Sequence, residues 1–214
     1  KIIFSSSASV HGTAETMPIT ESSSLGVTNP YGRTKLVIED MLRDLYVSDN
    51  GLGIVLLRYF NPIGAHKSGL IGENSNGVPN NLMPYICKVA KGEFPYLNVF
   101  GNDYDTVDGT GVRDYIHVDD LAAGHIQAYE KIKFANGLYT YNLGTGKGYS
   151  VLQVVNAFES ANNIKINYRI APRRAGDMAS VYADTKKAES ELRFKAQYGI
   201  DDMCRDSWNF YKHS

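Results

Sequence analysis

The chain has 214 residues, enough to bury a substantial apolar core in one domain or in one and a half. Hydrophobic residues make up 43%, charged residues 21%, and the formal net charge is −1, so composition gives no bias towards nucleic acid or membrane surfaces. No run approaches the roughly 20 apolar residues of a membrane span. Cys87 and Cys204 have neither metal-ligand spacing nor a disulfide framework. We therefore expect a cytoplasmic protein with no metal, nucleic-acid or membrane partner.

The chain opens with an apolar stretch, residues 1–4, that reads as a buried strand. Such a strand fits best inside a sheet whose other strands come from elsewhere. It leads into Ser5, Ser6 and Ser7, at the carboxyl end of the strand, where open α/β sheets place their ligands. A serine there can hydrogen-bond a substrate hydroxyl, although serine clusters are more often turns.

A helix is predicted from Pro30, because proline suits the first helical position and Asn29 or Thr28 can cap it. Apolar residues then recur with helical spacing. Tyr31 and Lys35 are four residues apart and share one helix face. A cation beside a phenol favours the phenolate, which suits removal of a proton from a sugar or steroid hydroxyl. A lone pair of this kind is more often a half-buried tyrosine and a solvated lysine.

The rest of the chain alternates strands and helices. Strands are predicted over residues 53–59, 138–143, 165–170 and 180–183, and helices over 119–132, 150–161, 185–192 and 200–211. The glycine-rich stretch 144–148 looks like a nucleotide loop but lacks the βαβ unit and the downstream acidic residue, so we expect scaffold. Trp208 is expected to be a core or interface aromatic.

Several stretches, in this order, closely resemble the UDP-glucose 4-epimerases of the extended short-chain dehydrogenase/reductase superfamily. They are the strand followed by SSS, the Y-x-x-x-K pair, RYFNPIGAH (58–66), PNNLMPY (79–85), DGTGVRDYIHV (108–118), YNLGTG (141–146) and PRRAGD (172–177). The resemblance runs from Lys1 to about Tyr211. Y-x-x-x-K alone would not identify the family, whereas the longer stretches are specific to it.

The resemblance implies an α/β fold. It comprises the C-terminal part of a Rossmann-type doubly wound parallel sheet and a smaller α/β substrate-binding domain. Residues 1–62 would be the remainder of the NAD-binding domain, and 63–214 mainly the UDP-sugar-binding domain, with 114–145 returning to the first. The family's N-terminal half-sheet, with its glycine-rich dinucleotide fingerprint, is missing from the sequence. We therefore expect a chain incomplete at its N-terminus, and NAD binding by the chain alone is in doubt.

The resemblance also assigns site residues. Ser7, Tyr31 and Lys35 match the catalytic positions: Tyr31 is the acid/base, Lys35 binds the nicotinamide ribose, and Ser7 orients the sugar. The same three residues and Phe60, beside the nicotinamide, match the cofactor contacts. The matched UDP-sugar contacts are Asn61, Asn81, Leu82, the backbone around Asn98, Val99 and Phe100, and Arg113, Arg174, Asp177 and Val181. Arginines suit a diphosphate because the guanidinium fork fits phosphate oxygens.

Two positions bear on specificity and geometry. Val181 occupies the position that gates the sugar pocket, and a small residue there leaves room for an N-acetyl group, so UDP-N-acetylglucosamine is a hypothetical second substrate. His11 stands where the family usually has tyrosine, and one residue is deleted before Tyr31. Either departure could displace Ser7 slightly.

The implied function is the interconversion of UDP-galactose and UDP-glucose in galactose metabolism, through oxidation at the sugar C4 by bound NAD, in a homodimer. Two alternatives stay open. One is another nucleotide-sugar enzyme, such as a dehydratase or decarboxylase, which would need an acidic pair where this chain has Ser6, Ser7 and Ala8. The other is a truncated, inactive chain that binds UDP-sugar weakly.

Overall fold

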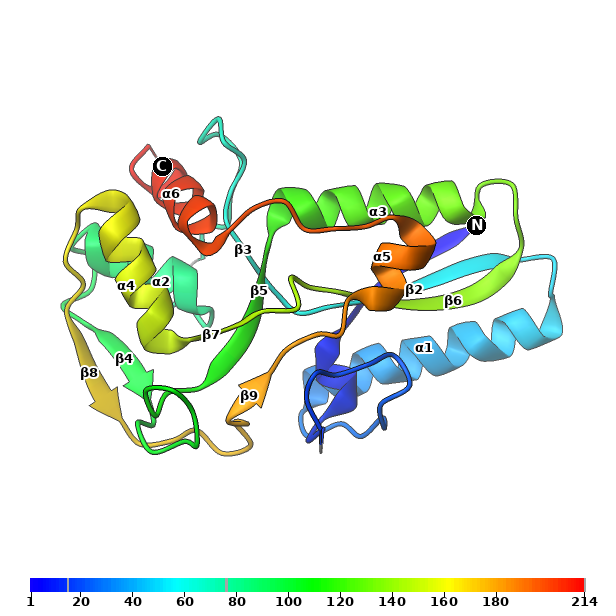
Figure 1. The fold of residues 1–214 in the computed structure, drawn as a ribbon, viewed down its shortest axis with the longest axis horizontal. Helices are drawn as coiled ribbons and strands as arrows, with labels where there is room; N and C mark the ends of the chain where they lie inside the picture. The colour runs from blue at the N-terminus through cyan, green and yellow to red at the C-terminus, as the bar shows by residue number, and fades with distance from the viewer. Residues whose placement is uncertain (15, 76, 214) are drawn as a thin grey trace.

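The structure of the chain is a computed structural model that describes residues 1–14, 16–75 and 77–213. Its centre is a parallel sheet of three strands, β1 (Ile2–Ser7), β2 (Gly53–Tyr59) and β6 (Gly137–Leu143), in the order β1-β2-β6. Helix α1 (Pro30–Ser48) covers one face, and α3 (Val118–Ile132) covers the other (Figure 1). The carboxyl ends of all three strands therefore lie at one edge of the sheet, as in Rossmann-type folds.

The position of each strand in the sheet explains its burial. β2 lies between the other two strands and is buried over six of its seven residues. β1 pairs with β2 on one side only, in the register Ser7 to Tyr59. The first four residues of β1 are half-buried, so the prediction of a buried strand over residues 1–4 is wrong about the burial. The strand also ends three residues later than predicted. Among the described residues, β1 has a neighbouring strand on one side only, so its side chains are covered less than those of β2.

Helix α1 begins as the sequence predicts. Pro30 is its first residue, and the Asn29 side chain accepts a hydrogen bond of 2.8 Å from the N–H of Gly32. Its buried residues, however, are Gly32 and Glu39, whereas Met41 of the apolar stripe stays exposed. The fully buried positions of α1 are thus a glycine, which meets Ser9 of η1, and a carboxylate, while Leu36 and Leu42 are only half-buried.

A second group of elements lies to one side of this sheet (Figure 1). It contains β3 (Asn61–Ile63), β4 (Leu97–Phe100), β5 (Val112–His117), β7 (Gly148–Ser150), β8 (Tyr168–Ala171) and β9 (Ser180–Val181), with helices α2 (Leu82–Ala90), α4 (Val151–Asn162) and α6 (Ile200–Tyr211). β5 pairs with β3 and β9 in parallel and with β7 in antiparallel orientation. β4 pairs in parallel with β8.

Two connecting elements complete the fold: a 3₁₀ turn, η1 (Ala8–His11), after β1, and α5 (Lys186–Leu192) after β9. The strand predicted from residue 165 begins only at Tyr168, because the N–H of Ile166 donates to Glu159 at 2.8 Å instead of to a strand. The predicted helix over 200–211 matches α6, and Trp208 packs edge-on against Phe158 as expected. Within the described residues, no helix is long and apolar enough to cross a membrane.

Candidate active site

The three residues predicted to be catalytic lie at the carboxyl edge of the central sheet. Ser7 ends β1 and caps η1, with its Oγ accepting a hydrogen bond of 3.2 Å from the N–H of Ser9. Tyr31 and Lys35 lie in the first two turns of α1. The Nζ of Lys35 donates to the carbonyl oxygen of Ser5 at 2.8 Å and lies 5.6 Å from the centroid of the Tyr31 ring. The lysine thus links the tyrosine to the strand that carries Ser7.

Two tyrosines lie near each other at this edge, and their surroundings differ. Tyr59 ends β2 beside Ser7, and burial raises the pKa of its phenol, with the neighbouring Tyr31 adding to the shift. Tyr31 is 53% exposed and has the Lys35 ammonium beside its ring. Tyr59 therefore stays neutral, and Tyr31 is the phenol that a ligand can reach.

The predicted nicotinamide neighbour and the predicted sugar gate lie in one small apolar cluster. Phe60 is 5% exposed, and Val181 of β9 packs against the cluster that it forms with Ile19 and Ala183. The backbone N–H of Phe60 donates to Leu143 at the end of β6, at 3.1 Å. The side chain at position 181 therefore packs against the apolar cluster that contains Phe60.

The predicted UDP contacts on β5 and on the segment before β9 also meet. Arg174 donates from Nε to Asp177 Oδ2 at 3.1 Å, and Nη2 of Arg113 lies 3.6 Å from Asp177 Oδ1. The guanidinium of Arg174 lies 4.7 Å from the ring centroid of Phe100. Arg113 is itself fixed, because its Nη1 donates to the carbonyl of Met178 at 2.9 Å. Four predicted residues thus form one cationic cluster with an aromatic face.

The remaining predicted contacts are placed separately. Asn81 occupies the N-cap position of α2 and donates a hydrogen bond of 2.9 Å to Glu73. Asn98 of β4 accepts a hydrogen bond of 2.7 Å from Arg169. Leu82, the first residue of α2, packs on the core. Val99 is buried, and Asn61 is exposed at the start of β3. The structure gives no direct contact between these residues and the catalytic three among the described part of the chain.

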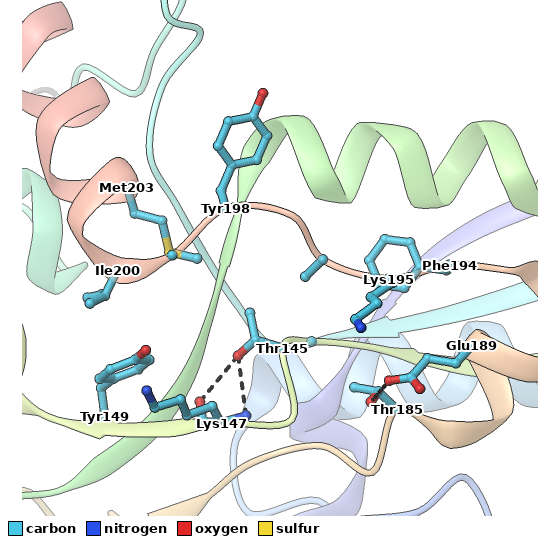
Figure 2. A pocket seen from close by; sticks show the side chains of 13 residues that line it. Thr145, Lys147, Tyr149, Thr185, Glu189, Phe194, Lys195, Tyr198, Ile200 and Met203 are labelled. Carbon is cyan, nitrogen blue, oxygen red and sulfur yellow. Dashed lines mark hydrogen bonds between the residues drawn. The ribbon is translucent and has the colours of Figure 1, made fainter.

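The glycine-rich stretch that looks like a nucleotide loop lies elsewhere. Its N–H groups at Thr145 and Gly146 donate to the carboxylate of Asp114, at 2.8 and 3.0 Å. This stretch lines a cavity of about 210 Å³. Lys195 and Ile200 line the same cavity (Figure 2). None of the predicted site residues lines this cavity. Because Asp114 already occupies these donors, the stretch acts as scaffold.

Sequence reasoning missed two buried charged residues behind the site. Arg58 lies within the apolar strand β2, and Glu39 lies one turn after Lys35 on α1; the two form an ion pair of 2.7 Å between Arg58 Nη2 and Glu39 Oε2. An arginine inside an otherwise apolar strand was the available signal, since charged residues are rarely buried unless they are paired.

Comparison with known proteins agrees with this arrangement. A protein-family model described as GDP-mannose 4,6 dehydratase matches residues 1–207. The UDP-glucose 4-epimerase of Bacillus subtilis (strain 168) is 59% identical over 210 residues, which are 98% of this chain and 62% of that protein. A crystal structure of UDP-glucose 4-epimerase from Bifidobacterium longum in complex with NAD+ and UDP is 56% identical, with a TM-score of 0.95 over 100% of this chain and 64% of that one. The enzyme from Stenotrophomonas maltophila, with bound NAD and formylated UDP-arabinopyranose, is 49% identical with a TM-score of 0.97, again over 100% of this chain and 64% of that one.

The chain therefore belongs to the GDP-mannose 4,6 dehydratase family, and its predicted Rossmann-type α/β fold is confirmed. Within that family, the resemblance to the UDP-glucose 4-epimerases stated from the sequence is also confirmed. The chain spans about three fifths of the length of the relatives it matches, since it covers 62% of the B. subtilis protein.

Proposed function

We propose that the protein interconverts UDP-galactose and UDP-glucose with NAD as bound cofactor, and that Tyr31 is the acid/base. The observation that carries this proposal is the position of the Lys35 ammonium, hydrogen-bonded to Ser5 at 2.8 Å and facing the Tyr31 ring. A fixed cation beside a reachable phenol suits reversible proton transfer with a sugar hydroxyl. The names of the similar proteins support the same activity.

The residues present suit the nicotinamide end of NAD. Lys35 and Tyr31 would hold the nicotinamide ribose, and Phe60 would face the ring; NAD, when bound, takes up and returns a hydride at the sugar C4. Tyr31 removes the proton from the 4-hydroxyl and later gives it back, while Ser7 orients that hydroxyl.

The UDP part is held apart from the reacting carbon. Arg113 and Arg174 supply guanidinium donors to the diphosphate, and Asp177 supplies a carboxylate for ribose hydroxyls. Firm binding of UDP and loose binding of the sugar let the 4-keto sugar turn and accept hydride on its opposite face. We assign residues 1–62 to the NAD-binding domain and 63–214 mainly to the sugar domain, with 114–145 returning to the first.

We propose further that the whole protein is a homodimer. The exposed apolar side chains of α1, Val37, Met41 and Leu45, support a second copy packing there. Burial of such a stripe against a like surface is the usual course for isologous dimers. Sedimentation of the wild type against Met41→Lys tests this, and a wild type that sediments as a monomer at micromolar concentration contradicts it.

The first test is conversion of UDP-galactose to UDP-glucose by the purified chain with NAD added. Turnover that Tyr31→Phe abolishes supports the proposal. UDP binding without turnover by the folded chain supports the alternative of a binding-competent but inactive chain. A dehydratase is the competing activity, because the family model carries that description; release of a deoxy-keto sugar instead of the C4 epimer would favour it.

A further inference from the structure

A fully buried ion pair lies directly behind the proposed catalytic residues. Glu39 of α1 is 0% exposed and Arg58 of β2 is 1% exposed. Arg58 donates from Nε to Glu39 Oε1 at 2.9 Å and from Nη2 to Oε2 at 2.7 Å, so the pair is bidentate. Although burial opposes it, the Arg58 guanidinium holds the pKa of Glu39 below its usual range. Both side chains are therefore charged inside the protein.

Further bonds tie this pair to the elements that carry the site. The Oγ of Ser6, next to Ser7 on β1, donates to Glu39 Oε1 at 2.5 Å. Nη1 of Arg58 contacts Nε2 of His11 on η1 at 3.3 Å and donates to the carbonyl of Glu21 at 3.0 Å. The network thus joins β1, β2, η1 and α1 through side chains alone.

The geometry relates the pair to Tyr31 and Lys35. Glu39 follows Lys35 by four residues and Tyr31 by eight, so the three side chains lie on one stripe of α1. A buried ion pair contributes little net stability, because desolvation of two charges offsets their attraction, and apolar residues of similar size often serve as well. Where such pairs are kept, fixing the register of packed elements is the best-attested role.

We propose that Glu39 and Arg58 are positioning residues: they fix α1 against β1 and β2, so that Lys35 stays bonded to Ser5 and beside Tyr31. This inference rests on the proposed function, since its consequence is the reactivity of Tyr31. Ser6 acts as the third anchor, because its bond to Glu39 fixes the helix to the residue before Ser7.

The main test is the double variant Glu39→Leu/Arg58→Met, which removes both charges and leaves neither unpaired in the core. Arg43, which also pairs with Glu39 at 2.6 Å, keeps its bond of 3.0 Å to Asp40. The matched control is Glu159→Leu/Lys165→Met, which removes an ion pair of 2.6 Å between α4 and the segment before β8. Two readouts separate positioning from mere stability. One is the split of the effect between kcat and KM, and the other is the nuclear Overhauser contact between the Lys35 side chain and the Tyr31 ring, assigned with Tyr31→Phe.

The double variant is expected to fold and to bind UDP within about twofold of the wild type. Its kcat should fall about tenfold to a hundredfold, because small misplacements of reacting groups cost rates of this order. KM should change less than kcat, and the Overhauser contact between Lys35 and Tyr31 should weaken, because the Lys35 ammonium is no longer held beside the Tyr31 ring. The control should change neither.

A folded double variant with the wild-type kcat and the wild-type Overhauser contact between Lys35 and Tyr31 would overturn the inference. If the wild type shows no turnover, the proposed function fails for this chain, and the Overhauser contact, which needs neither NAD nor sugar, still decides for or against the positioning role. If the double variant does not fold, Ser6→Ala decides: it leaves no buried charge unpaired and should weaken the same contact by a smaller amount. An unchanged contact in Ser6→Ala would then overturn the inference.

Discussion

Arg174 donates a hydrogen bond of 3.1 Å to Asp177, the carboxylate that also faces Arg113 at 3.6 Å from its other oxygen. The two arginines are 61 positions apart in the chain. The carboxylate of Asp177 lies between their guanidinium groups in space and holds them at one place. Arg173, the neighbour of Arg174, turns the other way and pairs with Asp103 at 2.6 Å. The two adjacent arginines of PRRAGD therefore differ in role: Arg174 is the proposed ligand-binding residue, and Arg173 is structural.

Arg174→Ala is expected to raise the Kd for UDP about tenfold, because one charge-assisted hydrogen bond from a partly exposed side chain contributes about 1.5 kcal/mol. Arg113→Ala should cost at least as much, since Arg113 is less exposed. Calorimetric titration with UDP measures both. Arg173→Ala is the matched control and should leave the Kd within about twofold; an equal loss in Arg173→Ala would contradict the separation of roles.

Much of the fold was predictable from local signals. The Asn29 cap and Pro30 define the start of α1, and apolar periodicity defines α6. The pairings of β5 with β7 and β9 were not predictable, because strands of two or three residues carry no periodicity and join segments far apart in the chain.

The candidate site was predictable only through the resemblance. Nothing in the spacing of Phe60 and Val181 indicates that they meet at one apolar cluster. Their proximity depends on where β9 pairs with β5. Glu39 was missed because a glutamate on a helix is normally solvated, and only its partner in β2 buries it. The catalytic and binding roles themselves stay predictions.

Val181→Tyr is expected to weaken binding of UDP-N-acetylglucosamine about tenfold or more, while binding of UDP-glucose changes by less than about threefold. On the hypothesis that Val181 gates the sugar pocket, the larger tyrosine side chain takes the space of the N-acetyl group, and such overpacking costs about 1–3 kcal/mol. Calorimetric titration with both nucleotides measures this. Val47→Tyr, at an exposed position near the end of α1, is the control. Equal affinity of the wild type and Val181→Tyr for the N-acetyl sugar would show the hypothesis to be wrong.

His11 is expected to make the folded state less stable in mild acid. Burial, and then the positive charge of Arg58, lower the pKa of His11. Because the folded pKa lies below the unfolded value of about 6.5, the unfolded chain binds more protons between the two. The contribution of His11 is therefore present above about pH 6.5 and is lost as the pH falls towards the folded pKa. Urea unfolding at about pH 7.5 and about pH 5.5 measures the difference.

His11→Tyr introduces the residue that the family usually has, whose hydroxyl does not titrate in this range. It should reduce the difference in unfolding free energy between the two pH values. His213→Gln removes an exposed histidine near the C-terminus and should leave that difference unchanged. A His11→Tyr variant with the full wild-type pH dependence would assign the effect to other groups.

Gly32→Ala is expected to destabilise the protein by about 1–3 kcal/mol, although glycine-to-alanine changes inside helices usually stabilise by about 1 kcal/mol. The sign reverses because a Cβ at position 32 would lie 2.8 Å from the carbonyl oxygen of Ser9, and that backbone cannot move without shifting η1. Since Gly32 follows Tyr31, the strain would also push the tyrosine away from Ser7. Urea unfolding measures the stability, and kcat should fall more than KM rises. Gly26→Ala, where an added Cβ meets nothing within 4 Å, is the control. A Gly32→Ala variant as stable as the wild type would mean that α1 and η1 can separate freely, and the close approach would then not position Tyr31.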